Sequence, residues 1–230
     1  MCEGILEKKE ETGMQYTTYL FDFDGTLVDS MPAYIHAMLK ILDDNHIRYG
    51  DDIIKTITPL GTKGTVAYYK KLGVPLSEDE ILERMGRYAY DAYAHTIPAK
   101  ENVKEVLRKL KENGADLNVL TASPHITLDI CLKRLGLYDF FTNVWSSDDF
   151  GMSKANPEIY VKAAEKLGKP IESILFLDDN FNADKTAKSA GMKVCGVYDK
   201  SSEEYMDEIK AVTDYYIYNF SELLTLKEKN

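Results

Sequence analysis

The stretch Tyr-Thr-Thr-Tyr-Leu-Phe-Asp-Phe-Asp-Gly-Thr at residues 16–26 decides the fold. Its first part is aromatic and β-branched, which is typical of a buried strand. The strand leads directly into Asp24, Gly25 and Thr26, which together are typical of a turn. A buried strand that ends in Asp22 and Asp24 therefore brings two carboxylates to one edge of a sheet.

Downstream of this strand, from about residue 102, helical and strand patterns alternate. Strands are predicted at residues 116–120, 142–145, 174–177, 192–197 and 214–218, and helices at 103–110, 126–135, 157–167 and 183–190, before a short terminal helix. Such alternation indicates an open parallel sheet covered by helices on both faces. The predicted fold class is α/β, with a Rossmann-like open parallel sheet core. In such sheets, ligands bind beyond the carboxyl ends of the strands.

The segment between the two parts of this pattern has helical spacing and almost no strand signal. Apolar residues recur at helical intervals from Ile35 to Leu42, and Ser77 precedes three acidic residues, as at a capped helix start. We therefore expect an all-helical subdomain at residues 31–96, inserted into a discontinuous core at 15–30 and 97–230. Residues 1–14 are expected to form a polar N-terminal extension.

The composition limits the choice of partners. The 230 residues carry a net charge of −10, and the pI is near 5.0. An acidic chain lacks the basic surface that nucleic acid requires, so nucleic acid is not the expected partner. A small anionic molecule still fits, provided that lysines or a bound cation reverse the field locally.

The lack of a recognisable membrane span or secretion signal and the small number of cysteines favour an intracellular location. No run approaches the roughly 18 apolar residues of a membrane span, and the first residues lack the apolar stretch of a secretion signal. Cys2, Cys131 and Cys195 are too few and too scattered for a disulfide framework or a zinc site. These features predict a cytoplasmic protein without a membrane partner, and they do not indicate an oligomeric state.

Polar residues gather at the predicted strand ends. They are Asp22 with Asp24, Thr121 with Ala122 and Ser123, Lys154 before a helix, and Asp178 with Asp179. Crowded carboxylates repel one another and lose hydration unless they are paired. A hard divalent cation with oxygen ligands is their natural partner, and Mg²⁺ suits a site that also holds phosphate. Lys154 would supply a second positive charge.

This set of residues predicts phosphoryl transfer. With Mg²⁺ bound, an ionised aspartate on the first strand can attack phosphorus and form an aspartyl-phosphate. The aspartate two residues later can protonate the leaving oxygen and then deprotonate the attacking water. Lys154 and a hydroxyl group such as that of Thr121 would stabilise the phosphoryl charge.

The pattern resembles the haloacid dehalogenase-like hydrolase superfamily over nearly the whole chain. Residues 22–26 match its D-x-D-G-T signature, which implies that Asp22 is the nucleophile and Asp24 the acid/base. The resemblance makes Thr121, Lys154 and the Asp178–Asp179 pair the second, third and fourth motifs. It implies Mg²⁺ held by Asp22, Asp179, Asp178 and the Asp24 carbonyl, and a mobile helical cap of the phosphoglycolate phosphatase and β-phosphoglucomutase type.

The chain departs from the family pattern at two places. Many relatives have proline directly after the motif lysine, whereas Ala155 and Asn156 precede Pro157 here. The fourth motif often has another acid four residues after its second aspartate, but this position is Ala183. The adjacent Asp184 is expected to point elsewhere on its helix.

The remaining candidates concern substrate contacts. Ala122 and Ser123 are predicted to bind substrate, as is Lys63 in a cap loop at residues 61–64. His125 is interpreted as a surface or core residue, although it follows Ser123 closely enough to approach substrate. Tyr93, in the last helix of the insertion, is predicted to be a packing residue.

Four functions fit these residues to different degrees. A phosphatase acting on a small phosphorylated metabolite is favoured. A phosphosugar mutase shares every catalytic part and could use Lys63 to hold a second phosphate, but such mutases have histidine four residues after the Ser30 position, where this chain has Tyr34. A non-enzymatic aspartate phosphoacceptor leaves Asp24 without a role, and a dehalogenase needs no such acid.

Overall fold

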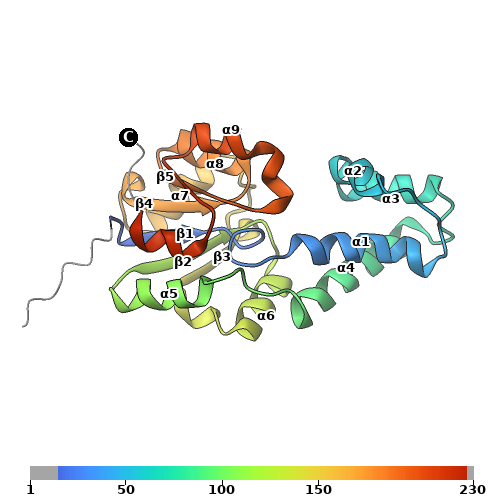
Figure 1. Cartoon of the computed structure of the whole chain (residues 1–230), viewed down its shortest axis with the longest axis horizontal. Helices are drawn as coiled ribbons and strands as arrows, with labels where there is room; N and C mark the ends of the chain where they lie inside the picture. Colours follow the sequence, from blue (N-terminus) through green and yellow to red (C-terminus); the bar gives the residue numbers. More distant parts are fainter. Residues whose placement is uncertain (1–14, 227–230) are drawn as a thin grey trace, which may run out of the picture.

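The computed structural model describes residues 15–226 and contains a six-stranded parallel sheet (Figure 1). The predicted extension at residues 1–14 lies outside the described part. The strand order is β3-β2-β1-β4-β5-β6, with bounds β1 Thr18–Phe21, β2 Asp116–Thr121, β3 Asn143–Ser146, β4 Ile174–Asp178, β5 Lys193–Val197 and β6 Tyr215–Ile217. The predicted α/β class with an open parallel sheet is confirmed.

Helices cover both faces of the sheet (Figure 1). One face packs against α5 (Val103–Glu112), α6 (His125–Leu135) and the 3₁₀ helix η6 (Phe220–Thr225), and the other against α7 (Glu158–Leu167) and α8 (Phe181–Ala190). Successive side chains of β1 point to opposite faces of the sheet, so Tyr19 and Phe21 enter the first core and Leu20 enters the second. Each of these three side chains is almost completely buried.

The centre of the sheet is where the strand order reverses. Phe21 pairs with Val119 of β2 on one side and with Leu177 of β4 on the other. The next residue, Asp22, donates its backbone N–H to the Leu177 carbonyl at 2.8 Å. The carboxyl ends of β1 and β4 therefore meet at a topological switch point, where such sheets bind ligands.

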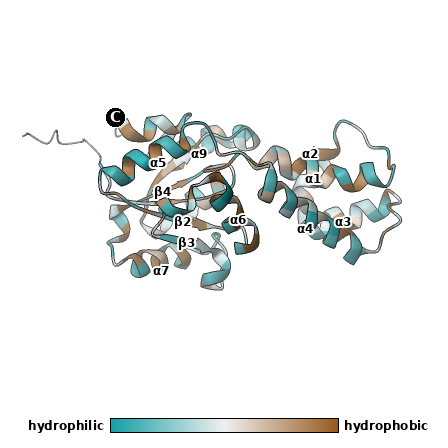
Figure 2. Ribbon diagram, turned by 90° about the horizontal axis from the view of Figure 1, so that it is seen from below, coloured by the Kyte–Doolittle hydropathy of each residue, from teal (hydrophilic) through white to brown (hydrophobic). Residues whose placement is uncertain are grey.

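A separate helical unit extends from this end of the sheet (Figures 1 and 2). It consists of α1 (Met31–Asp44), α2 (Ile53–Ile57), α3 (Gly61–Lys71) and α4 (Glu78–His95). Its helices bury a core of their own, made of Met38, Ile41, Leu42, Ile53, Ile57, Val66, Tyr69, Val74 and Ile81. Ser77 starts α4 with a capping box to Glu80, which accounts for the helix start seen in the sequence.

Two chain segments connect the helical unit to the sheet, and they pair with each other. Asp29 donates its backbone N–H to the Pro98 carbonyl at 3.0 Å, and Lys100 donates to the Leu27 carbonyl at 3.0 Å. Val28 and Ala99 form an antiparallel bridge between them. Both connections therefore leave the core as one short ribbon beside residues 22–26.

The structure differs from the sequence prediction at two places in the chain. Residues 61–64, predicted as a cap loop, form the first turn of α3 instead. The helix α9 (Met206–Val212) was not predicted, because Ile209 is its one fully buried residue and its apolar stripe is correspondingly weak. No helix within residues 15–226 is long and apolar enough to cross a membrane.

Candidate active site

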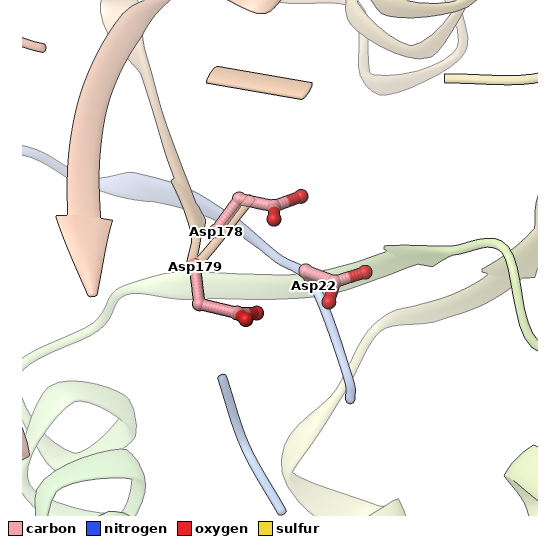
Figure 3. A group of neighbouring side chains, drawn as sticks. All are labelled: Asp22, Asp178 and Asp179. Atoms are coloured by element: carbon pink, nitrogen blue, oxygen red, sulfur yellow. The ribbon is translucent and has the colours of Figure 1, made fainter. Parts of the chain in front are cut away.

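Three buried aspartates meet at the carboxyl ends of β1 and β4. Asp22, Asp178 and Asp179 are 5%, 1% and 8% exposed, and each offers a carboxylate oxygen within 4.8 Å of the others. Figure 3 shows the three carboxylates projecting to the same side of the two strand ends. Within residues 15–226 this is the one such set of potential metal ligands.

Lys154 is the cation bound directly to this cluster. From the loop before α7, its Nζ donates to Asp22 Oδ1 at 2.5 Å and to Asp178 Oδ2 at 2.6 Å. The Tyr160 hydroxyl can donate to the Lys154 carbonyl at 3.1 Å, which holds that loop. Burial opposes the ammonium charge, but Asp178 and Asp22 outweigh it and raise the pKa of Lys154 above its ordinary value.

One lysine leaves the cluster with an excess of negative charge. Burial, offset by Lys154, raises the pKa of Asp22 to about 7. Burial, followed by repulsion from Asp178 and Asp22, raises the pKa of Asp179 well above its usual range. Three crowded carboxylate oxygens in this state fit a hard divalent cation, which prefers oxygen ligands.

The turn after β1 passes so close to Asp179 that residue 25 has no space for a side chain. Gly25 has φ +76°, and a Cβ atom there would overlap the Asp179 carboxylate. The next residue, Thr26, donates its hydroxyl to Asp179 Oδ1 at 3.3 Å. Residue 25 must therefore be glycine for two reasons. Its backbone conformation is left-handed, and a side chain there would displace Asp179, a predicted metal ligand.

We expect Gly25→Ala to lower the free energy of unfolding by about 1–3 kcal/mol, through backbone strain and the displaced Asp179. It should also weaken divalent-cation binding. Gly86→Ala is the matched control, because Gly86 lies in α4 with no atom within 4 Å of its added Cβ. The control should gain about 0.5–1 kcal/mol from higher helix propensity. Denaturant unfolding and calorimetric metal titration measure both effects, and wild-type values for Gly25→Ala would contradict this account.

Asp24 lies beside the acidic cluster and accepts hydrogen bonds from two hydroxyl groups. Ser123 Oγ donates to Asp24 Oδ2 at 2.5 Å, and Tyr93 OH donates to Asp24 Oδ1 at 2.6 Å. Thr121, which is 1% exposed, accepts the backbone N–H of Ser123 at 3.1 Å. Ala122 is exposed beside them. The predicted second motif thus adjoins the predicted acid/base, and Ser123 contacts Asp24 itself.

Two other sequence candidates are not brought into this cluster. Lys63 is exposed on α3, in the helical unit away from the sheet, and makes no hydrogen bond or ion pair within the described range (Figure 1). His125 pairs with Asp129 at 3.0 Å and with Asp149 at 2.8 Å. Hydrogen bonds to these two carboxylates raise the pKa of His125, as expected for a surface ion pair.

Asp184 does not point away from the cluster, so that expectation is wrong. Its side chain is fully buried, and neither carboxylate oxygen has a hydrogen-bond partner among the described residues. Burial, then Asp178 and Asp179, raise its pKa well above the usual range. Asn180 caps α8 and fixes a helical phase in which positions 183, 184 and 187 all face inward. Asp184 thereby adds another acid close to the cluster.

Lys100 is a second lysine at the site, and the sequence did not single it out. Its Nζ donates to the Gly25 carbonyl at 2.5 Å, the Tyr198 carbonyl at 2.6 Å and Asp199 Oδ2 at 2.9 Å. These bonds tie the turn after β1 to the end of β5. The available signal was weak, since a lysine two residues after Pro98 is usually a solvated residue.

Comparisons with known proteins show which family this chain resembles. The family model described as haloacid dehalogenase-like hydrolase matches residues 19–197. Pyrophosphatase PpaX of Bacillus velezensis is 29% identical over 187 residues, which is 81% of this chain and 85% of that protein.

Two solved structures have the same fold. The "crystal structure of putative beta-phosphoglucomutase from Thermotoga maritima" has a TM-score of 0.79 and 22% identity, covering 90% of this chain and 96% of that one. A "predicted phosphoglycolate phosphatase" from Haemophilus somnus has a TM-score of 0.74 and 24% identity, covering 92% and 97%.

Proposed function

This chain belongs to the haloacid dehalogenase-like hydrolase family, and we propose that it is a phosphatase that works through an aspartyl-phosphate on Asp22. The observation that carries the proposal is the direct contact of Lys154 with Asp22, at 2.5 Å, beside Asp178 and Asp179. A lysine in this place favours the ionised form of a buried carboxylate, which is the form that attacks phosphorus. The predicted substrate is a small phosphorylated metabolite.

The proposed reaction has two steps. An Asp22 carboxylate oxygen forms a bond to phosphorus while the bond from phosphorus to the leaving oxygen breaks, and Asp24 gives its proton to that oxygen. Water then attacks the phosphorus of the aspartyl-phosphate, Asp24 takes a proton from the water, and Asp22 is released. Asp24 regains in the second step the proton that it gave in the first.

The other residues stabilise charge in this scheme. Lys154 lies next to Asp22, where it neutralises the incoming phosphoryl oxygens, and the hydroxyl group of Thr121, which accepts the Ser123 N–H, can donate its own proton to one of them. Asp22, Asp178 and Asp179, with the Asp24 carbonyl, would hold Mg²⁺. When bound, this ion supplies positive charge that offsets the phosphoryl and carboxylate charges.

We further propose that residues 31–96 act as a cap over a core of residues 15–30 and 97–230. Cap closure would exclude bulk water and select the substrate. Lys63 would contact substrate only in such a closed arrangement. Since the similar PpaX proteins are called pyrophosphatases, inorganic pyrophosphate is the first compound to test, followed by phosphoglycolate and hexose phosphates.

A substrate screen with and without Mg²⁺ tests this function. We expect phosphate release from at least one of these compounds, and loss of release when EDTA removes the metal. Undiminished release in EDTA would overturn the metal requirement. Isomerised hexose phosphate without phosphate release would instead identify a mutase, for which Tyr34 provides no counterpart of the histidine noted above.

A further inference from the structure

The C-terminal turn of α4 brings a tyrosine hydroxyl to the proposed acid/base. Tyr93 OH donates to Asp24 Oδ1 at 2.6 Å. Tyr93 belongs to the helical unit, whereas Asp24 belongs to the turn after β1, so this bond joins residues 69 positions apart. The sequence predicted only a packing role for Tyr93, and nothing in the proposed scheme yet uses its hydroxyl.

Contacts other than the bond to Asp24 also hold Tyr93 in place. Its ring stacks on Phe23, with ring centres 6.0 Å apart and an interplanar angle of 25°. Arg134 of α6 donates to the Tyr93 carbonyl at 3.1 Å and also to the Ile97 carbonyl. The end of α4 is therefore attached to the core, and Tyr93 is fixed to the core independently of Asp24.

The surroundings of Tyr93 keep its hydroxyl group a donor. Burial and the nearby Asp24 carboxylate both raise the pKa of Tyr93 above its ordinary value, so the hydroxyl keeps its proton. Ser123 donates to the other Asp24 oxygen at 2.5 Å. Two donors on opposite oxygens fix the rotation of the Asp24 carboxyl plane, which neither donor could fix alone.

We propose that Tyr93 is a positioning residue that aims the Asp24 carboxyl group at the leaving oxygen and at the attacking water. The inference rests on the proposed function, because it assigns Tyr93 a role in proton transfer by Asp24. Proton transfer requires donor and acceptor within hydrogen-bond reach, so a carboxyl group free to rotate would be misplaced for part of the time. Tyr93 itself exchanges no proton with the substrate.

This role predicts a dependence on the leaving group. The p-nitrophenolate of p-nitrophenyl phosphate is a leaving group that departs readily without protonation. The alkoxide of an alkyl phosphate needs a proton from the acid. Tyr93→Phe keeps the ring and its stacking on Phe23 but removes the hydroxyl. We expect it to lower kcat/KM for an alkyl phosphate about 10-fold or more, and that for p-nitrophenyl phosphate much less. A purely structural defect would lower both alike.

Tyr88→Phe is the matched control. Tyr88 lies on the same helix, and its hydroxyl donates to Asp44 within the helical unit, away from Asp24. Its loss should leave both kcat/KM values within about twofold of wild type, since exposed hydrogen bonds contribute little. Thermal unfolding of both variants shows whether they remain folded.

A double-mutant cycle tests whether Tyr93 acts through Asp24. In the Asp24→Ala background, which should itself be slowed by roughly 100-fold or more, adding Tyr93→Phe should cause no further loss, because the group it positions is gone. A further loss of the same size as in the wild-type background, equal losses for both substrates, or no loss at all would overturn the role of Tyr93. A wild-type rate for Asp24→Ala would instead contradict the proposed function itself.

Discussion

Asp22→Asn is expected to lower the rate of phosphate release by at least about 1,000-fold, as loss of a nucleophile does in other covalent mechanisms. An amide oxygen carries no full negative charge and cannot form the acyl-phosphate bond. The size of residue 22 is preserved, and its amide oxygen can still accept the hydrogen bond that Lys154 now gives to Asp22 Oδ1. Phosphate release and acid-stable labelling of the protein by a labelled substrate measure the loss.

The control for this variant is Asp207→Asn, on the exposed first turn of α9. It makes the same change of charge outside the proposed site and should keep wild-type turnover. Both variants should unfold cooperatively at temperatures near that of the wild type. Asp22→Asn protein that still releases phosphate, or that still becomes labelled, would show that another group attacks phosphorus.

The proximity of Asp22 and Lys154 could be predicted from the sequence, although 132 positions separate the two residues. Local patterns placed each residue at a strand end or just before a helix, and parallel strands share one carboxyl edge. The same reasoning applied to Asp178 and Asp179. Their convergence follows from sheet topology, which the alternation of helical and strand segments reveals without any knowledge of side-chain packing.

The orientation of Asp184 was mispredicted, and the hydroxyl contact of Tyr93 was not foreseen although its packing role was correct, because both depend on packing. The inward direction of Asp184 follows from the phase that the Asn180 cap gives to α8, and a shift of one residue would rotate it by about 100°. The contact of Tyr93 with Asp24 depends on how Arg134 attaches the end of α4 to α6. Periodicity predicts that a helix exists, but not where its end docks.

Lys63 illustrates a different limit. Its position relative to the site depends on the orientation of a whole helical unit that has its own core. Short-range sequence patterns determine that core, whereas its orientation depends on long-range contacts such as those of Arg134 with the end of α4. The sequence can therefore predict that the unit is helical, but not how a single residue such as Lys63 lies relative to the substrate.

Lys154→Met is expected to have the second-largest effect, lowering kcat/KM by about 100- to 1,000-fold. The change removes the positive charge that faces the phosphoryl group, while the methionine keeps most of the side-chain volume. It also leaves Asp22 and Asp178 without the bonds at 2.5 and 2.6 Å that now satisfy them. Unpairing a buried ion cluster costs about 3–5 kcal/mol of stability.

The pH dependence of the Lys154→Met variant separates the loss of charge from general damage. Burial raises the pKa of Asp22 and Lys154 opposes that rise, so the pKa of Asp22 must increase when the lysine is removed. Asp22 attacks in its ionised form, and the acidic limb of the kcat/KM profile should therefore move to higher pH at saturating Mg²⁺. Protonation relieves the unpaired carboxylates, so the stability loss should be smaller near pH 5 than at pH 8. Lys162→Met on α7, where Lys162 pairs with exposed Glu158 at 3.1 Å, is the control and should shift neither profile. An acidic limb at the wild-type position in Lys154→Met would show that Lys154 does not set the ionisation of the nucleophile.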